Sequence, residues 1–291
     1  MAMETMTREG FRNFVKDAVS EYLPDNYEIF VQSVNKPSGA YTGVGAREKG
    51  SKIAPVINTD DFYPRYLNGE CLVDLLKEIS NTFINAPRPV TNDFIDWVND
   101  YNKVKSHLFI KVLNDRSVPD GVLKRTKMDI AIIPYVLIQK DSNGFSAFAV
   151  TEDLLKMWDV NGDDIIEDAI SNGNELFPLR ISSIAEELGF DEGDDDTPFR
   201  IITVEGKQGG AAAVFYPDTL ERVSELFGGD FMLLPSSVHE MLALPHVADF
   251  EVDAYREMVM KINSEVVDER DRLTDSVYRY HHDRRELVKE A

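Results

Sequence analysis

Hydrophobic positions recur with a helical period in two stretches near the start of the chain. Residues 7–22 and 70–85 both carry apolar side chains at intervals of three and four. This spacing places the apolar side chains on one face of a helix, so both stretches are predicted to be amphipathic helices packed on a core. Thr7 is suited to cap the first helix, and Pro24 to end it. In the second helix the side chains expected to face the core are Leu72, Leu75, Leu76 and Ile79.

Three runs rich in β-forming residues lie between these helices, at 27–34, 40–46 and 51–58. Lys-Pro-Ser-Gly separates the first two runs and is typical of a turn. We therefore predict a helix, a three-stranded meander and a second helix, which together make residues 1–88 an N-terminal unit. The segment Ala-Pro-Arg-Pro at 86–89 is the best internal boundary, because prolines interrupt regular structure.

Residues 89–291 show a mixture of strand and helix patterns that predicts a second unit. Strands are expected at 107–113, 128–139, 145–150, 199–204, 211–216, 231–234 and 238–244. Helices are expected at 92–101, 151–158, 163–172, 217–227 and 249–263, and the tail 266–291 is compatible with helix. Because most strands return through short turns, we expect an α+β fold with largely antiparallel sheets, packed helices and a C-terminal helical tail. The pattern leaves open whether the two units pack as a single domain.

Two side chains in the second unit carry specific expectations. The run Asp-Ile-Ala-Ile-Ile-Pro-Tyr-Val-Leu-Ile at 129–138 is almost wholly apolar, which is typical of a central strand buried on both faces. Pro134 lies within it and has no N–H to donate to a sheet, so a bulge or a sheet edge is expected there. Trp158 is expected to be buried at the end of a helix.

The composition narrows the class of protein. The chain has 291 residues, a net charge of −21 and a single cysteine, Cys71. This charge argues against general binding to nucleic-acid backbones, and one cysteine excludes an intramolecular disulfide. No stretch has the 18 apolar residues of a membrane span, and the N-terminus lacks the apolar core of a signal peptide. A cytoplasmic location is therefore expected.

The charge is unevenly distributed along the chain. Residues 151–196 carry fifteen acidic and two basic side chains, and they end in the acidic run Asp191–Asp196, which we expect to be a mobile surface loop. Residues 103–127 carry seven basic and two acidic side chains. One interpretation is two solvated faces that attract each other. The other is a docking surface, basic or acidic, for a charged partner. A third interpretation is that the acidic segment mimics DNA.

Several short motifs begin like cofactor or metal sites and then depart from them. Gly43-Val-Gly45 lacks the third glycine of a dinucleotide loop, and the residues around Gly206-Lys207 favour a hairpin turn over a phosphate loop. Residues 159–163 start like a calcium loop without its glycine and its glutamate. His239-Glu240 lacks the second histidine of a zinc protease, and His281-His282 lie in a charged tail. We expect no cofactor and no metal site.

One polar cluster remains, formed by Ser236, Ser237, His239 and Glu240 after an apolar run. In an extended strand Ser237 and His239 would share a face, and Glu240 would lie on the other. A serine and a histidine at this spacing could form a catalytic pair, which would still need a third group. The alternative is structural: the serines cap a turn, and His239 binds Ser237 or a backbone carbonyl. These four residues are therefore candidates, and no catalytic residue is assigned.

Three segments resemble an uncharacterised bacterial family, the domain of unknown function 5688. They are residues 43–79, from Gly-Val-Gly to Lys-Glu-Ile, the Leu-Leu-Pro-Ser-Ser-Val-His-Glu segment at 233–240, and residues 258–280. A weaker resemblance, in the order of helix, hairpin and proline-containing strand, is to the YtpQ-type family. Neither resemblance implies an established activity. The first implies a link to mobile-element biology, because the family is common in gut anaerobes and often occurs on mobile elements.

Two functions are consistent with these observations. The first is a cytosolic, non-enzymatic binding or adaptor protein that meets a protein partner through a charged surface. The second is a small hydrolase-like enzyme that uses Ser236 or Ser237 with His239. A pocket that converges on His239 with a carboxylate in reach would favour the enzyme. The sequence leaves the oligomeric state open.

Overall fold

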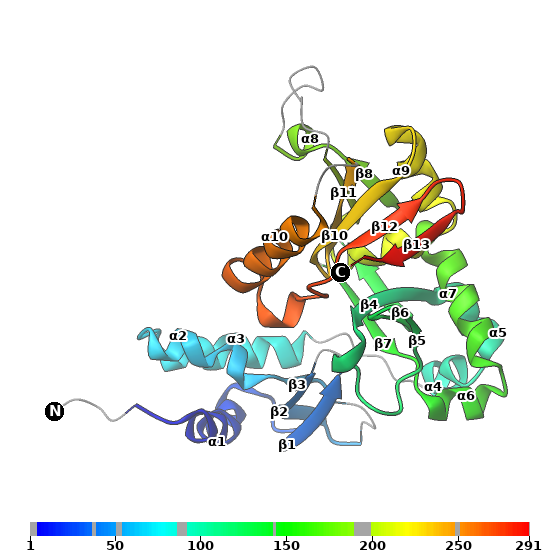
Figure 1. Cartoon of the computed structure of the whole chain (residues 1–291). Coiled ribbons are helices and arrows are strands. Elements are labelled where there is room, and N and C mark those ends of the chain that lie inside the picture. The colour runs from blue at the N-terminus through cyan, green and yellow to red at the C-terminus, as the bar shows by residue number, and fades with distance from the viewer. Residues whose placement is uncertain are drawn as a thin grey trace. The chain divides into compact units, whose positions relative to one another are not determined.

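The computed structural model of the protein describes residues 5–36, 39–50, 54–85, 92–141, 144–188, 199–247 and 251–290. The chain divides into two compact units, Met1–Val98 and Asn99–Ala291 (Figure 1). Both units combine helices with antiparallel sheets, so the predicted α+β class is confirmed. The acidic run Asp191–Asp196 and the segment 86–89 lie outside the described residues.

The first unit contains the predicted helix, meander and helix. Its elements are α1 (Arg8–Ala18), η1 (Val19–Tyr22), β1 (Tyr27–Lys36), β2 (Gly39–Glu48), β3 (Val56–Ile57), η2 (Thr59–Asp61), α2 (Tyr63–Leu67), α3 (Leu72–Ile84) and α4 (Asn92–Val98). The strands form an antiparallel sheet in the order β1-β2-β3. Thr7 caps α1 as predicted, since its side chain accepts a hydrogen bond from the backbone N–H of Gly10 at 3.1 Å.

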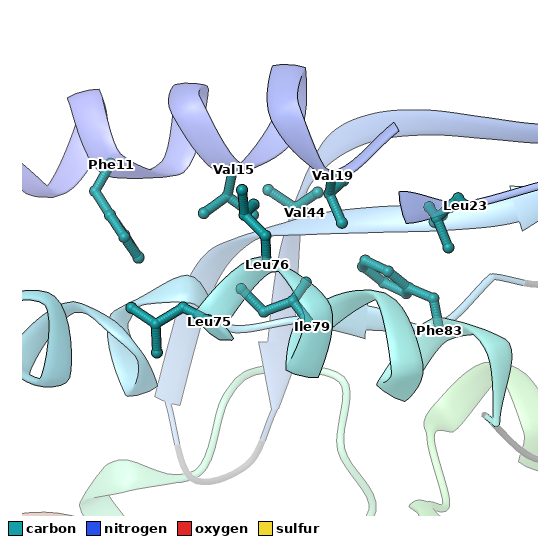
Figure 2. Close-up of a cluster of buried hydrophobic side chains, with 10 residues drawn as sticks. Phe11, Val15, Val19, Leu23, Val44, Leu75, Leu76, Ile79 and Phe83 are labelled. Carbon is teal, nitrogen blue, oxygen red and sulfur yellow. The ribbon is translucent and has the colours of Figure 1, made fainter. Parts of the chain in front are cut away.

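One apolar cluster between α1, α3 and β2 forms the core of this unit (Figure 2). Leu75, Leu76 and Ile79 are buried in it, as predicted, while Leu72 is half-buried at its margin. The cluster also contains Phe11, Val15, Val19, Leu23, Val44, Ala46 and Phe83.

The two glycines of Gly43-Val-Gly45 have a packing role in the first unit. A Cβ atom at Gly45 would lie 2.5 Å from the ring of Phe30, and one at Gly43 would lie 2.3 Å from the carbonyl oxygen of Ile57. At Gly43 the contact is with backbone, so only a residue without a side chain fits there, whereas at Gly45 the ring of Phe30 would have to move. The motif is therefore explained by close packing.

The second unit begins with a four-stranded sheet covered by helices. The strands are β4 (Leu108–Asn114), β5 (Arg125–Lys127), β6 (Ile130–Asp141) and β7 (Gly144–Ala149), and β6 pairs with the other three. The helical elements around it are α5 (Tyr101–Val104), η3 (Lys105–His107), η4 (Asp115–Ser117), α6 (Glu152–Trp158) and α7 (Gly162–Leu176). Trp158 is buried at the end of α6, as predicted.

The prediction for Pro134 is wrong, although β6 is the buried central strand that its sequence indicates. One edge of β6 pairs with β4, and the other is shared by β5, which reaches Ile132, and β7, which begins opposite Tyr135. Pro134 lies where the pairing with β7 begins: its carbonyl accepts from the N–H of Val150 at 2.9 Å. The carbonyl of Val150, to which a proline cannot donate, accepts from the N–H of Leu123 at 2.9 Å instead. The bulge occurs later, between Leu137 and Gln139.

A six-stranded antiparallel sheet completes the second unit. Its order is β13-β12-β10-β11-β9-β8. The strands are β8 (Leu179–Ser182), β9 (Arg200–Val204), β10 (Phe231–Ser237), β11 (Glu240–Pro245), β12 (Tyr278–His281) and β13 (Glu286–Lys289). The remaining helical elements are α8 (Ile184–Leu188), η6 (Gly210–Phe215), α9 (Thr219–Phe227), α10 (Val252–Glu265) and η7 (Glu269–Asp271).

Apolar side chains point to both faces of β10 in turn, which explains why α9 and α10 flank this sheet (Figure 1). Met232 and Leu234 belong to the cluster that includes Tyr255 and Val259 of α10. Phe231 points to the opposite face, where its ring lies 5.9 Å from that of Phe227 in α9. A strand whose successive side chains point to opposite faces can be buried under a helix on both.

Two expectations for the second unit are corrected. Residues 211–215 belong to the 3-10 helix η6 rather than to a strand, because the small side chains of Ala211, Ala212 and Ala213 are buried and permit close packing. The C-terminal tail contains the three-residue helix η7 but is otherwise not helical where the structure describes it, and it forms the hairpin of β12 and β13. In β12 the alternation of buried Tyr278 and Tyr280 with partly exposed neighbours gives the two-residue period of a strand.

Candidate functional site

The cluster expected to carry chemistry lies at the turn between β10 and β11. A strand was predicted at 238–244, but β11 begins only at Glu240, so His239 lies in the turn. The side chain of Ser237 accepts a hydrogen bond from the backbone N–H of His239 at 3.0 Å. Ser236 donates to Oε1 of Glu240 at 3.2 Å. Both serines therefore bind within the hairpin.

The imidazole ring of His239 has partners at both nitrogens. Nδ1 accepts a hydrogen bond from the backbone N–H of Gly209 at 3.0 Å, and Nε2 lies 3.5 Å from Oδ1 of Asp271. Because Nδ1 accepts, the proton of the neutral ring is on Nε2 and faces the carboxylate of Asp271. Neither Ser237 nor a backbone carbonyl, the expected partners, binds the ring.

The same turn also forms hydrogen bonds with three other elements of the second unit, β9, η6 and η7. Thr203 of β9 donates from its hydroxyl to the carbonyl of His239 at 2.8 Å. The carbonyl of Val238 accepts from Ala211 at 3.2 Å, and its N–H donates to Asp271 at 2.8 Å. A Cβ atom at Gly210 would lie 2.2 Å from the hydroxyl of Thr203. The turn therefore holds the Gly206–Gly210 loop by close backbone contact.

The Gly206–Gly210 loop uses its own amides and leaves no cradle for a phosphate. Lys207 donates its N–H to Val204, Gln208 to Gly206, and Gly210 to Lys207. Residues 159–163 serve as helix caps: Asp159 ends α6 in the left-handed region, and Asn161 caps α7. No group of three or more potential metal ligands occurs among the described residues.

A pocket of about 300 Å³ lies between α9 and the C-terminal hairpin. It is lined by Glu221, Glu225, Tyr280, His282, Asp283 and Arg285, and we call it the α9 pocket. Glu221 and Glu225 are one turn apart on the helix, so their side chains share a face. The side chains of Glu225, Asp283 and Arg285 make no ion pair with any other residue that the structure describes.

Tyr280 brings a buried hydroxyl to this pocket. The residue is 1% exposed, and the carboxylate of Glu221 lies near its hydroxyl without forming a well-aligned hydrogen bond. Burial, the negative charge of Glu221 and the contact of the hydroxyl with that carboxylate raise the pKa of Tyr280 to about 12. A buried hydroxyl without a good partner is costly, and it marks a position where a ligand atom would restore a hydrogen bond.

Asp230 fixes the end of the hairpin that forms the pocket. Its Oδ2 accepts from Arg279 at 2.8 Å and lies 3.1 Å from Nδ1 of His281, and its Oδ1 accepts from the backbone of His282 at 2.9 Å. Burial raises the pKa of Asp230, but these hydrogen bonds outweigh burial and hold the pKa below its ordinary value. His282 is therefore held in place by an ionised carboxylate.

Comparison with known proteins identifies the family. The chain matches the family of unknown function DUF5688 over residues 8–282. It belongs to the DUF5688 family. The resemblance to that family is confirmed, whereas the weaker one to the YtpQ-type family is not shown. No curated protein and no solved structure matches the chain.

In this DUF5688 chain the basic stretch 103–127 is largely paired within the molecule. Lys105 lies 2.9 Å from Asp168 of α7, and Arg125 forms ion pairs with Asp163 at 3.1 Å and Glu167 at 2.5 Å. These acidic partners belong to the acidic segment 151–196. Lys105 and Arg125 therefore connect the basic stretch to the acidic segment.

The α9 pocket was not found from the DUF5688 sequence. Four of its residues, Tyr280, His282, Asp283 and Arg285, lie in the tail that was expected to be helical. The available signal was the alternation Tyr-Arg-Tyr-His at 278–281, which is too short to outweigh a helix-compatible composition. No helix among the described residues has the length and apolarity needed to cross a membrane.

Proposed function

We propose that this DUF5688 protein is a non-enzymatic binding protein that docks a basic side chain of a partner protein in the α9 pocket. The observation that carries the proposal is that the pocket is lined both by several carboxylates and by the buried hydroxyl of Tyr280. Three carboxylates and one guanidinium line the pocket, which leaves it negatively charged. A cation that enters would gain Coulomb energy and hydrogen-bond acceptors at once.

The charge of the whole chain supports this choice of ligand. A net charge of −21 creates a field that attracts basic partners and accelerates their encounter. The basic stretch 103–127 has its own acidic partners, such as Asp168 for Lys105, so we do not assign it a docking role. We further infer a cytoplasmic setting, which suits a chain whose single thiol, Cys71, is exposed.

A hydrolase built on Ser236 or Ser237 with His239 is the competing function. In such an enzyme a ring nitrogen of the histidine takes the proton of the serine. Here Nδ1 of His239 accepts from Gly209, and Nε2 faces Asp271. Neither ring nitrogen is available to a serine, and this favours binding over catalysis.

The proposal is tested by titrating the whole protein with short blocked peptides, acetyl-Gly-Arg-Gly-amide and acetyl-Gly-Lys-Gly-amide, at low salt. Calorimetry measures the affinity, and amide chemical shifts in NMR spectra locate the peptide. We expect binding that shifts the amides of α9 and of the hairpin residues 280–285. Absence of binding by both peptides would overturn the proposal.

A charge-matched control separates the pocket from the general field of an acidic protein. The variant Glu221→Gln/Glu225→Gln removes two charges from the pocket. The control Glu257→Gln/Glu265→Gln removes two from the exposed side of α10, where both glutamates are exposed and make no ion pair within the described part of the chain. Only the first variant should abolish binding; an equal loss in both would mean nonspecific attraction.

A further inference from the structure

The hydroxyl of Ser224 determines which nitrogen of His282 carries the proton. Ser224 Oγ donates its single proton to the carbonyl of Gly229 at 2.8 Å. The same oxygen lies 2.8 Å from Nδ1 of His282. With its proton already used, the hydroxyl can only accept there, so Nδ1 of His282 must be the N–H donor.

This arrangement leaves Nε2 of neutral His282 as a hydrogen-bond acceptor. The ring lines the α9 pocket, and Nε2 has no partner among the described residues. The backbone N–H of His282 is held by Asp230 at 2.9 Å, which limits movement of the residue. In its neutral form the ring thus offers an oriented acceptor beside the carboxylates of the pocket.

The number and placement of acceptors distinguish between the two common basic side chains. Carboxylates approach the pocket from Glu221 and Glu225 on α9 and from Asp283 on the hairpin, and His282 adds a fourth acceptor residue. A lysine ammonium is compact and has three N–H donors, whereas an arginine guanidinium is planar and has five. Acceptors that lie on two separate elements suit the broader, multiply donating group.

We infer that the α9 pocket selects guanidinium over ammonium, with Nε2 of His282 as the acceptor that discriminates between them. This inference rests on the proposed function of the pocket and names its ligand as an arginine side chain of a partner protein. His282 acts here as a specificity-determining residue, and Ser224 acts through it as a positioning residue.

The test compares the two blocked peptides on the full-length protein and on variants of His282. We expect the arginine peptide to bind about tenfold more tightly than the lysine peptide, as one added charge-assisted hydrogen bond would give. His282→Phe should reduce the affinity for the arginine peptide to that for the lysine peptide, so that the preference disappears. His282→Gln, which restores an acceptor, should recover part of the preference.

The outcomes separate the inference from the function on which it rests. Equal affinity for both peptides in the unmodified protein would overturn guanidinium selectivity and leave the binding proposal standing, whereas no binding of either would overturn both. An unchanged preference in His282→Phe would also overturn the role of His282.

The nitrogen-15 shifts of the His282 ring give a readout that is independent of the ligand. They should show Nδ1 protonated in the parent and a mixture of tautomers in Ser224→Ala. Protonation at Nε2 in the neutral parent ring would overturn the inference.

Discussion

The hydroxyl of Tyr278 donates a hydrogen bond to Oδ1 of Asp129 at 2.5 Å, across 149 residues of sequence. Asp129 lies just before β6 of the first sheet of its unit, and Tyr278 lies in β12 of the second. Ser276 donates to the other carboxylate oxygen at 2.5 Å, and Lys289 donates to it at 3.0 Å. One carboxylate therefore joins both sheets of residues 99–291.

Asp129→Asn should destabilise this unit. Burial raises the pKa of Asp129, but the hydrogen bonds from Ser276 and Tyr278 and the charge of Lys289 outweigh it and hold the pKa below its ordinary value. The amide is neutral and cannot accept at both positions, so we expect a loss of about 1–3 kcal/mol in the free energy of unfolding. Urea unfolding of both proteins at pH 7 measures it.

The pH dependence of that loss has a definite sign. A carboxylate whose pKa is lower in the folded state contributes its full stability above its unfolded pKa, about 3.9, and loses it as the pH falls through the folded value. The stability difference between the parent and Asp129→Asn should therefore be constant near neutrality and shrink below about pH 4. A difference that grows on acidification would contradict the role of Asp129.

Leu76→Ala should destabilise the first unit, because Leu76 is 4% exposed within the cluster between α1 and α3. Removal of its buried methyl groups should lower the free energy of unfolding by about 2–5 kcal/mol. The matched control is Leu67→Ala, which deletes the same atoms from a side chain that is 52% exposed. Thermal melts should show a large shift for Leu76 and little for Leu67; similar shifts would mean that Leu76 is misplaced.

Gly210→Ala tests the close contact beneath the β10–β11 turn. The added methyl group would lie 2.2 Å from the hydroxyl of Thr203 and 2.5 Å from the carbonyl of His239, so the backbone must move. A cost of about 1–3 kcal/mol is expected, as for other overpacked sites. Gly229→Ala is the control, because nothing lies within 4 Å of a Cβ atom there. The denaturant midpoint should fall for Gly210→Ala and stay close to that of the parent for Gly229→Ala.

The sequence predicts elements well where one pattern is sustained. Leu75, Leu76 and Ile79 repeat over a full helix, and the long apolar run of β6 has the composition of a buried strand. Short elements depend on their neighbours instead. Ala211–Ala213 carry little β preference and form η6, because small side chains fit a crowded site. His282 could not be placed near α9, because the tail reaches this sheet through the pairing of β12 with β10, which joins distant parts of the chain.

His239→Ala distinguishes the structural role of His239 from a catalytic one. The ring accepts from the N–H of Gly209 and faces Asp271, so its loss leaves a half-buried backbone donor without its partner. We expect a decrease of about 1–3 kcal/mol in stability, a lower melting temperature and unchanged peptide binding once corrected for the folded fraction. In a hydrolase, the same change would leave the melt nearly unaltered and abolish turnover of p-nitrophenyl acetate. Measuring melt, binding and ester turnover on one preparation decides between them: turnover by the parent that disappears in a variant of unchanged melting temperature would establish catalysis.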